Sequence, residues 1–145
     1  MEIGVYYKFY LSFENSLCKD YLTEKVFEAY SAGMVPVVYG GANYDLFLPR
    51  GSYINVESFP STKSLADYLL YLDQNPSEYL KYFKWKTSSI LVSDHTNMGN
   101  GYCQLCEKLH KDYPLGITKV IPNVTEWIFM DGKQGNPSCR APEEW

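Results

Sequence analysis

Apolar and polar side chains alternate between Phe9 and Phe13, and a run of polar residues then ends the pattern. A period of two is typical of a β-strand with two different faces, so we predict a strand that carries Asn15 to its carboxyl end. Further along the chain, apolar side chains recur at the spacing of one helix face. The Thr23 hydroxyl is placed to accept a hydrogen bond from an unpaired backbone N–H. This predicts a helix that begins at Glu24.

A short and almost wholly apolar run at residues 35–38 lies between Gly33 and Gly40. Such a run is typical of a strand buried between helices, and Gly33 is a suitable end for the preceding helix. The order strand, helix, strand predicts a right-handed crossover between parallel strands. We therefore expect an α/β fold, a Rossmann-like parallel sheet with flanking helices, with Phe13 and Val37 buried in its core.

The downstream pattern predicts a third strand and two further helices. Residues from Tyr53 to Val56 alternate as in a short strand, and Ser64 precedes a segment with one apolar helix face. Asn75 and Glu78 are spaced as in a capping arrangement, so we expect a second helix to begin between them.

Composition indicates one globular domain, because 145 residues with 46% hydrophobic side chains supply a core of that size. We place this domain at residues 1–115 and expect residues 116–145 to form an irregular tail. A net charge of -4 without a Lys/Arg cluster argues against nucleic acid and anionic membrane surfaces as partners. No apolar run approaches the ~18 residues of a membrane span.

Four polar residues are predicted to converge near the carboxyl end of the first strand: Asn15, Tyr21, Glu24 and Lys25. Open α/β folds bind ligands at this edge, where the unpaired N–H groups of a helix N-terminus favour an anion. Lys25 would add charge for a phosphate, and the Glu24 carboxylate suits ribose hydroxyls. Because Glu24 and Lys25 also fit an ordinary solvated first turn, these residues alone predict only an anion or nucleotide site.

The cysteines leave several pairings open. Cys103 and Cys106 have the spacing shared by zinc half-sites, redox motifs and local disulfides. A zinc site would need further ligands, for which His110 and Cys139 are the candidates, and we expect no metal site. Cys18 and Cys139 are each either free or paired with a residue that the spacing does not identify.

One N-glycosylation sequon occurs in the chain, at Asn123-Val124-Thr125. Two other asparagines that precede a serine two positions later are excluded, because proline follows each of them. The sequon agrees with a lumenal protein, although cytosolic proteins also carry such triplets by chance. Asn123 is therefore a glycosylation candidate.

Three motifs lie close together: FENS at residues 13–16, DYLTEK at 20–25 and AGMVPVVYG at 32–40. Together they resemble the donor-binding signature of the α1,3-fucosyltransferases, and the similarity extends to about Lys86. The resemblance implies an inverting glycosyltransferase of the GT-B type, in which two Rossmann-like domains face each other across a cleft. This chain resembles the C-terminal half of that fold, so residues 1–115 would bind GDP-fucose.

The resemblance also assigns roles to the four candidate residues. Glu24 would bind the ribose hydroxyls and Lys25 the diphosphate, while Asn15 and Tyr21 would help to hold the nucleotide. Lys25 and the helix N-terminus would stabilise the charge on departing GDP without a metal ion, so no cofactor is expected beside the donor. The family's general base lies in the N-terminal domain, so we expect no catalytic residue in this chain.

Partners and compartment are implied in the same way. We expect a truncated sequence, which in full length has an N-terminal domain, a single membrane anchor and a Golgi-lumenal location, and which acts on N-acetylglucosamine-containing glycans. In the full-length protein, Cys103 and Cys106 would form disulfides with cysteines nearer the amino end, which this chain does not contain. Two alternatives stay open: a GT-B enzyme that uses another nucleotide sugar, and a non-catalytic nucleotide-binding or interaction module left by truncation.

Overall fold

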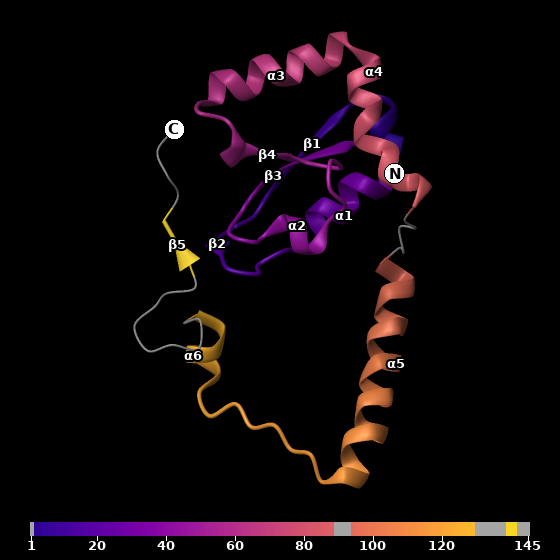
Figure 1. The fold of residues 1–145 in the computed structure, drawn as a ribbon, viewed down its shortest axis with the longest axis vertical. Helices are drawn as coiled ribbons and strands as arrows, with labels where there is room; N and C mark the ends of the chain where they lie inside the picture. The colour runs from indigo at the N-terminus through magenta and orange to yellow at the C-terminus, as the bar shows by residue number, and fades with distance from the viewer. Residues whose placement is uncertain (1, 89–93, 130–138, 142–145) are drawn as a thin grey trace.

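The computed structural model describes residues 2–88, 94–129 and 139–141 (Figure 1). At its centre lies a parallel sheet with the strand order β1-β3-β4. The strands are β1 (Phe9–Phe13), β3 (Val35–Tyr39) and β4 (Ile54–Asn55). Phe9 lies opposite Val35, and Val37 lies opposite Ile54. The predicted Rossmann-like parallel sheet is confirmed, including the crossover from the first strand to the second.

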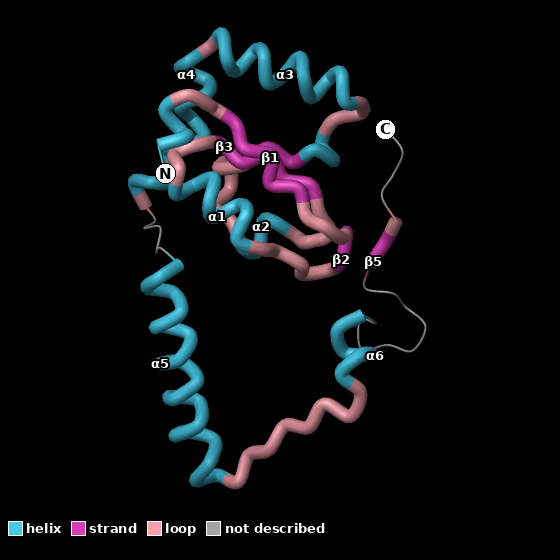
Figure 2. The backbone as a smooth tube through the Cα atoms, turned by 180° about the vertical axis from the view of Figure 1, so that it is seen from behind, coloured by secondary structure: helices cyan, strands magenta, loops and turns pink. Residues whose placement is uncertain are grey.

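Helices cover both faces of this sheet (Figures 1 and 2). One face carries α1 (Glu24–Ser31) and α2 (Tyr44–Phe47), and the other carries α3 (Thr62–Gln74) and α4 (Pro76–Tyr79). The remaining elements are η1 (Glu2–Val5), β2 (Leu17–Cys18), η2 (Val56–Ser58), η3 (Leu80–Thr87), α5 (Asp94–Asp112), η4 (Tyr113–Leu115), α6 (Val124–Phe129) and β5 (Cys139–Arg140). The segment expected to be an irregular tail therefore contains a short helix and a short strand.

The core between α1 and the sheet is built around Val26, Tyr30 and Val38. The ring of Tyr30 lies 4.9 Å from that of Trp85, which reaches this face from η3. The Tyr30 hydroxyl shares a 2.6 Å hydrogen bond with Ser52, so the only polar atom of this buried ring has a partner. The helix begins at Glu24 as predicted.

The second core lies between β3, β4 and α3, with Val37, Leu65 and Leu72 among its buried residues. Val37 is fully buried, as predicted. The start of α3 corrects the prediction, because Ser61 rather than Ser64 caps this helix. Ser61 Oγ accepts the backbone N–H of Ser64, and Ser64 Oγ accepts the backbone N–H of Ser61, so the two serines form the capping box.

The start of α4 lacks the side-chain cap predicted for Asn75. The Asn75 amide instead donates to the carbonyl of Tyr71, one turn earlier in α3, at 2.7 Å. Glu78 accepts a 2.6 Å hydrogen bond from Lys81. The helix begins at Pro76 nevertheless, since proline fixes φ near the helical value and has no N–H to satisfy.

The two faces of β1 differ from the prediction in which side chains they bury. Phe13 is 38% exposed and Leu11 is 59% exposed, whereas Ser12 is buried. Ser12 faces α1, where its hydroxyl donates to the carbonyl of Lys25 at 3.3 Å. On the opposite face the ring of Phe13 has the ring of Tyr39 as a neighbour at 5.8 Å. The prediction that Phe13 is buried is wrong, because β1 is the edge strand of the described sheet and its apolar face is only partly covered.

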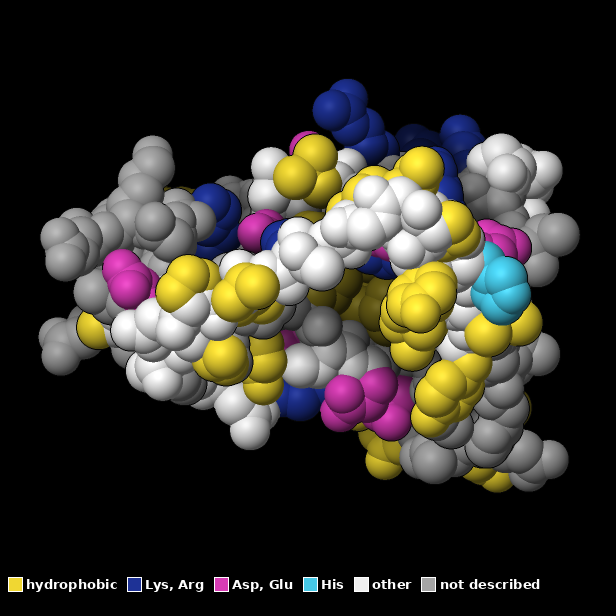
Figure 3. All heavy atoms as spheres, turned by 90° about the horizontal axis from the view of Figure 1, so that it is seen from below, with side chains coloured by type: hydrophobic (Ala, Val, Ile, Leu, Met, Phe, Trp, Pro, Cys, Tyr) yellow, Lys and Arg dark blue, Asp and Glu magenta, His cyan; other side chains and the backbone are white. Residues whose placement is uncertain are grey.

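The helix α5 extends away from the sheet (Figures 1 and 2). Its apolar residues Tyr102, Leu105 and Leu109 are all more than half exposed. Figure 3 views the molecule from the end at which α5 finishes, and hydrophobic side chains are spread over that face. In the described part of the chain, no helix is both long enough and apolar enough to cross a membrane.

Candidate functional site

The candidate site lies where β1 and β3 end and α1 begins. The ladder between the strands continues one step beyond β1, because the backbone N–H of Glu14 donates to the carbonyl of Tyr39 at 2.9 Å. Residues 14–23 then return the chain to the N-terminus of α1. The parallel arrangement therefore places the first polar residues after β1 beside the positive end of a helix.

Lys25 occupies the centre of this site. Its ammonium donates to Asn15 Oδ1 at 2.5 Å and to the carbonyl of Phe13 at 2.6 Å. The same nitrogen lies 3.9 Å from Glu14 Oε2, and a quarter of the Lys25 side chain remains exposed to solvent. Two of the predicted site residues, Asn15 and Lys25, are therefore in direct contact at the carboxyl end of β1.

Glu14 is a site residue that sequence reasoning missed. Its side chain is 2% exposed, and its carboxylate accepts hydrogen bonds from the backbone N–H and the hydroxyl of Thr23, at 2.9 and 2.8 Å. Thr23 therefore donates its hydroxyl hydrogen bond instead of accepting one, and the predicted Thr23 cap is wrong. A signal was present, because an acidic residue directly after an apolar strand lies where loop and helix N–H groups gather.

Tyr21 and Glu24 lie along the approach to α1. The backbone N–H of Tyr21 donates to the carbonyl of Cys18 at 3.2 Å, and its side chain is partly exposed. Asp20, before it, has a φ of 59°, a left-handed conformation that turns the chain toward the helix. Glu24 is the exposed first residue of α1, where a negative side chain is favoured by the helix dipole.

Two glycines allow the loop after β3 to pack against the loop after β1. A Cβ at Gly40 would lie 2.4 Å from the Tyr44 hydroxyl and 3.0 Å from Glu14 Cγ. A Cβ at Gly41 would lie 2.5 Å from the carbonyl oxygen of Cys18. Real Cβ atoms do not approach so closely, so only glycine permits the two loops to meet at the edge of the sheet.

The Tyr44 hydroxyl is buried beneath this edge. It has no hydrogen-bond partner among the described residues. Burial, and next the negative charge of Glu14, raise the pKa of Tyr44 from 10.0 to about 12. The Tyr44 side chain is therefore a neutral phenol at physiological pH. It is packed below the Glu14 carboxylate, which accepts the two hydrogen bonds from Thr23.

A hollow of about 250 Å³ opens beside Asn15. It is lined by residues 14–17, by Tyr39, and by Cys139 and Arg140 of β5. Cys139 and Cys18 form a disulfide, so the two cysteines whose state was left open are paired with each other. Because Cys139 is disulfide-bonded, the alternative of a zinc site that uses it as a ligand is contradicted. Elsewhere in the described residues, no group of three or more His, Cys, Asp and Glu side chains is placed to hold a metal ion.

The other sequence candidates lie away from the hollow. Cys103 and Cys106 are exposed free thiols on α5, and their predicted pairing with cysteines outside this chain stays a prediction. Asn123 is exposed just before α6, where its Oδ1 accepts the backbone N–H of Glu126 at 3.0 Å. Its glycosylation also stays a prediction.

Comparison with known proteins gives one consistent family. The family model described as glycosyltransferase family 10 (fucosyltransferase) C-term matches residues 1–127. Human alpha-(1,3)-fucosyltransferase 4 is 46% identical over 127 residues, which are 84% of this chain and 23% of that protein. Glycoprotein 3-alpha-L-fucosyltransferase A of Drosophila melanogaster is 40% identical over 124 residues, which are 83% of this chain and 24% of that protein.

The fold comparison agrees. A solved structure, the crystal structure of alpha1,3-fucosyltransferase with GDP-fucose, is matched with a TM-score of 0.50 and 32% sequence identity. The match covers 54% of this chain and 23% of the solved one. The chain thus spans about a quarter of the length of these relatives. The family match over residues 1–127 and the identity to these relatives show that the chain belongs to glycosyltransferase family 10, the fucosyltransferases, and corresponds to their C-terminal part.

Proposed function

We propose that this chain is the donor-binding part of an α1,3-fucosyltransferase that transfers fucose from GDP-fucose to N-acetylglucosamine-containing glycans with inversion. The observation that carries the proposal is the position of Lys25. Its ammonium is fixed 2.5 Å from Asn15 Oδ1, at the carboxyl end of a parallel strand and in the first turn of α1. A related solved structure holds GDP-fucose, which supports the same donor here.

Each site residue has a proposed role in holding the nucleotide. Lys25 binds the diphosphate together with the unpaired N–H groups at the start of α1. Glu24 accepts hydrogen bonds from the ribose hydroxyls, and Asn15 and Tyr21 hold the nucleotide from the side of β1. Glu14 acts through Thr23, because its two hydrogen bonds fix the residue that directly precedes α1.

The proposed chemistry needs a cation where the negative charge develops. As the bond from fucose to the diphosphate breaks, charge accumulates on the departing GDP. Lys25 is already held in place by Asn15 and the Phe13 carbonyl, so it stabilises that charge with little reorganisation. The general base and the acceptor site belong to an N-terminal domain outside this chain, and no metal cofactor is part of the proposal.

The proposed compartment is the Golgi lumen, reached through a membrane anchor outside this chain. The Cys18–Cys139 disulfide suits an oxidising compartment. We propose Asn123 as a glycosylation site, since its side chain is exposed and its cap hydrogen bond uses Oδ1 rather than the amide nitrogen. Removal of a glycan by peptide N-glycosidase F from secreted wild type, but not from the Thr125→Ala variant, tests this site.

Calorimetric titration with GDP, GDP-fucose, GDP-mannose and UDP tests the proposed function, because nucleotide binding needs only the donor half. Folding is checked first by circular dichroism. Selective binding of the guanine nucleotides supports a fucosyltransferase donor site. A preference for UDP contradicts it and favours another GT-B enzyme, whereas no binding by the folded chain favours a non-catalytic module.

A further inference from the structure

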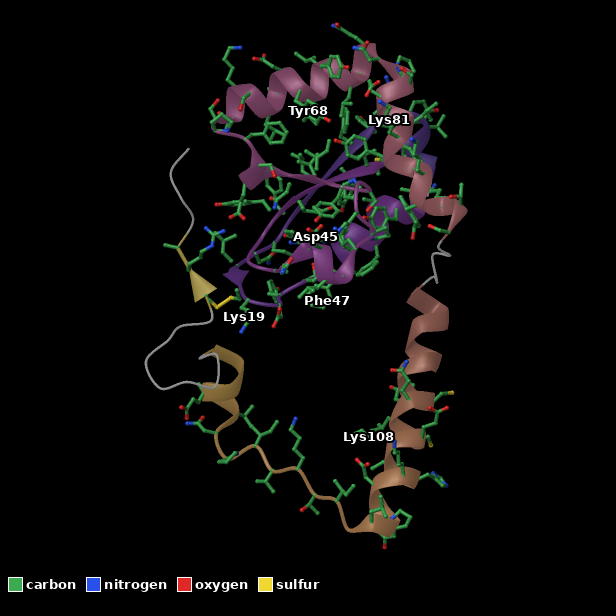
Figure 4. All side chains as sticks on the ribbon, in the orientation of Figure 1. Lys19, Asp45, Phe47, Tyr68, Lys81 and Lys108 are labelled. Atoms are coloured by element: carbon green, nitrogen blue, oxygen red, sulfur yellow. A yellow bond between two sulfur atoms is a disulfide. The ribbon has the colours of Figure 1, made fainter. Side chains whose placement is uncertain are left out.

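The segment β5 is joined to the candidate site by two kinds of bond. It pairs antiparallel with β2, so that Cys18 lies opposite Cys139 and Leu17 opposite Arg140. The disulfide connects residues 121 positions apart in the sequence. Figure 4 shows this bond near Lys19, with β5 beside β2. A two-residue ladder is weak by itself, so the covalent bond is what holds β5 against β2.

This position places a guanidinium beside the candidate site, where β1 and β3 end. Arg140 lines the same hollow as Asn15, whose Oδ1 binds the ammonium of Lys25. Arg140 also forms an ion pair with Glu57, which follows β4. Glu57 is itself oriented, because its backbone N–H donates to Asn55 Oδ1 at 3.0 Å. The arginine is therefore held from the carboxyl ends of the sheet on one side and from β2 on the other.

We propose that Arg140 is an additional donor-binding residue, which contacts the phosphate groups, and that the Cys18–Cys139 disulfide is the tether that positions it. This inference rests on the proposed function, since it assigns a second cation to the same site. A guanidinium presents a planar fork of N–H donors and can serve a carboxylate and a phosphate together. The family match ends at residue 127, so neither Cys139 nor Arg140 belongs to the part of the chain that the family model describes.

The first test compares GDP binding by wild type, Arg140→Gln and Arg140→Lys. Arg140→Gln should weaken binding roughly threefold to tenfold, as for one partly exposed charge-assisted contact. It should also make the affinity less dependent on salt, which a purely structural role would not do. Arg140→Lys should recover part of the affinity and the salt dependence. Equal affinity and equal salt dependence in folded Arg140→Gln and wild type overturn the proposal.

The second test addresses the tether. Tris(2-carboxyethyl)phosphine supplies two electrons and water supplies one oxygen and two protons, so that the S–S bond breaks, two thiols form and the phosphine becomes its oxide. Reduction should weaken GDP binding by wild type as much as Arg140→Gln does. Cys139→Ser should bind weakly from the start and show no response to the reductant. The control variant, Cys103→Ser with Cys106→Ser, removes the two free thiols of α5 and should behave as wild type.

The outcomes separate this inference from the proposed function. If wild type binds GDP and Lys25→Ala weakens binding while Arg140→Gln does not, only the role of Arg140 is wrong. If the folded wild-type chain binds no GDP, both proposals fail. If Arg140→Gln weakens binding but reduction of wild type does not, Arg140 contacts the donor and the tether is unnecessary, which overturns the second half of the proposal.

Discussion

The helices α3 and α5 both carry apolar residues at helical spacing, yet only those of α3 pack into a core. Leu72 of α3 is 1% exposed and packs against β3 and β4. Leu109 of α5 is 56% exposed, and Leu105 is exposed to a similar extent. The difference lies in the available partner, because α3 faces a sheet and α5 extends away from it (Figure 1). An apolar helix face thus predicts a contact without identifying what makes it.

The largest expected difference between the two helices is in stability. Leu72→Ala should lower the free energy of unfolding by ~2 to 5 kcal/mol, because it leaves a cavity in the core. Leu109→Ala should change it by less than ~0.5 kcal/mol, because its side chain buries little surface in this chain. Urea unfolding of both variants measures the contrast. A comparable loss in Leu109→Ala would show that α5 packs on the sheet in solution.

The next largest expected effect is a loss of stability at alkaline pH, caused by two tyrosines of the sheet region. Burial raises the pKa of both Tyr30 and Tyr44 from 10.0 to about 12. Between these values the folded chain holds protons that the unfolded chain releases, so stability falls as pH rises from about 10 to 12. Each tyrosine lowers the free energy of unfolding by about 1.4 kcal/mol per pH unit over that window. Urea midpoints measured from pH 8 to pH 11.5 check this, and an unchanged midpoint at the upper end would contradict it.

Glycine substitutions should have opposite signs in the two regions. Gly40→Ala should destabilise the chain by ~1 to 3 kcal/mol, because the new Cβ overlaps the Tyr44 hydroxyl. Gly101→Ala in α5 meets no atom within 4 Å and should stabilise its helix by ~0.5 to 1 kcal/mol. Thermal unfolding monitored by circular dichroism gives both values. A stabilised Gly40→Ala variant would mean that the two loops do not meet as described.

A smaller expected effect concerns the ribose contact. Glu24→Ala should weaken GDP binding by about five- to tenfold while leaving pyrophosphate binding unchanged. Glu28→Ala is the matched control, since it removes the same charge one turn further along α1. Calorimetry with both ligands makes the comparison. If pyrophosphate binding falls as much as GDP binding, Glu24 does not act on the ribose.

The sequence predicted the strand–helix–strand unit well, because each of its elements has a clear period and a clear end. Val37 is buried and α1 begins at Glu24, as expected. The burial of Phe13 was predicted wrongly, because alternation identifies two faces of a strand but not how much of each is covered. The helix α5 was not predicted, since glycine and asparagine are frequent in its first half and favour other conformations.

The candidate site was predicted in part. The contact between Asn15 and Lys25 follows from parallel strand topology, which brings the end of β1 to the start of α1. The buried role of Glu14 did not emerge, because an acidic residue after a strand also suits a solvated loop. The Cys18–Cys139 pair was not deduced either, since four cysteines allow three sets of two disulfides and the spacing favours none.

The affinity of Lys25→Ala for GDP tests the central claim most directly. Lys63→Ala is its control, because it removes the same charge from an exposed pair on α3. Lys25→Ala should bind GDP at least about tenfold more weakly than wild type, with a smaller dependence on salt, whereas Lys63→Ala should match wild type. Wild-type affinity in a folded Lys25→Ala variant would contradict a donor site at the end of β1.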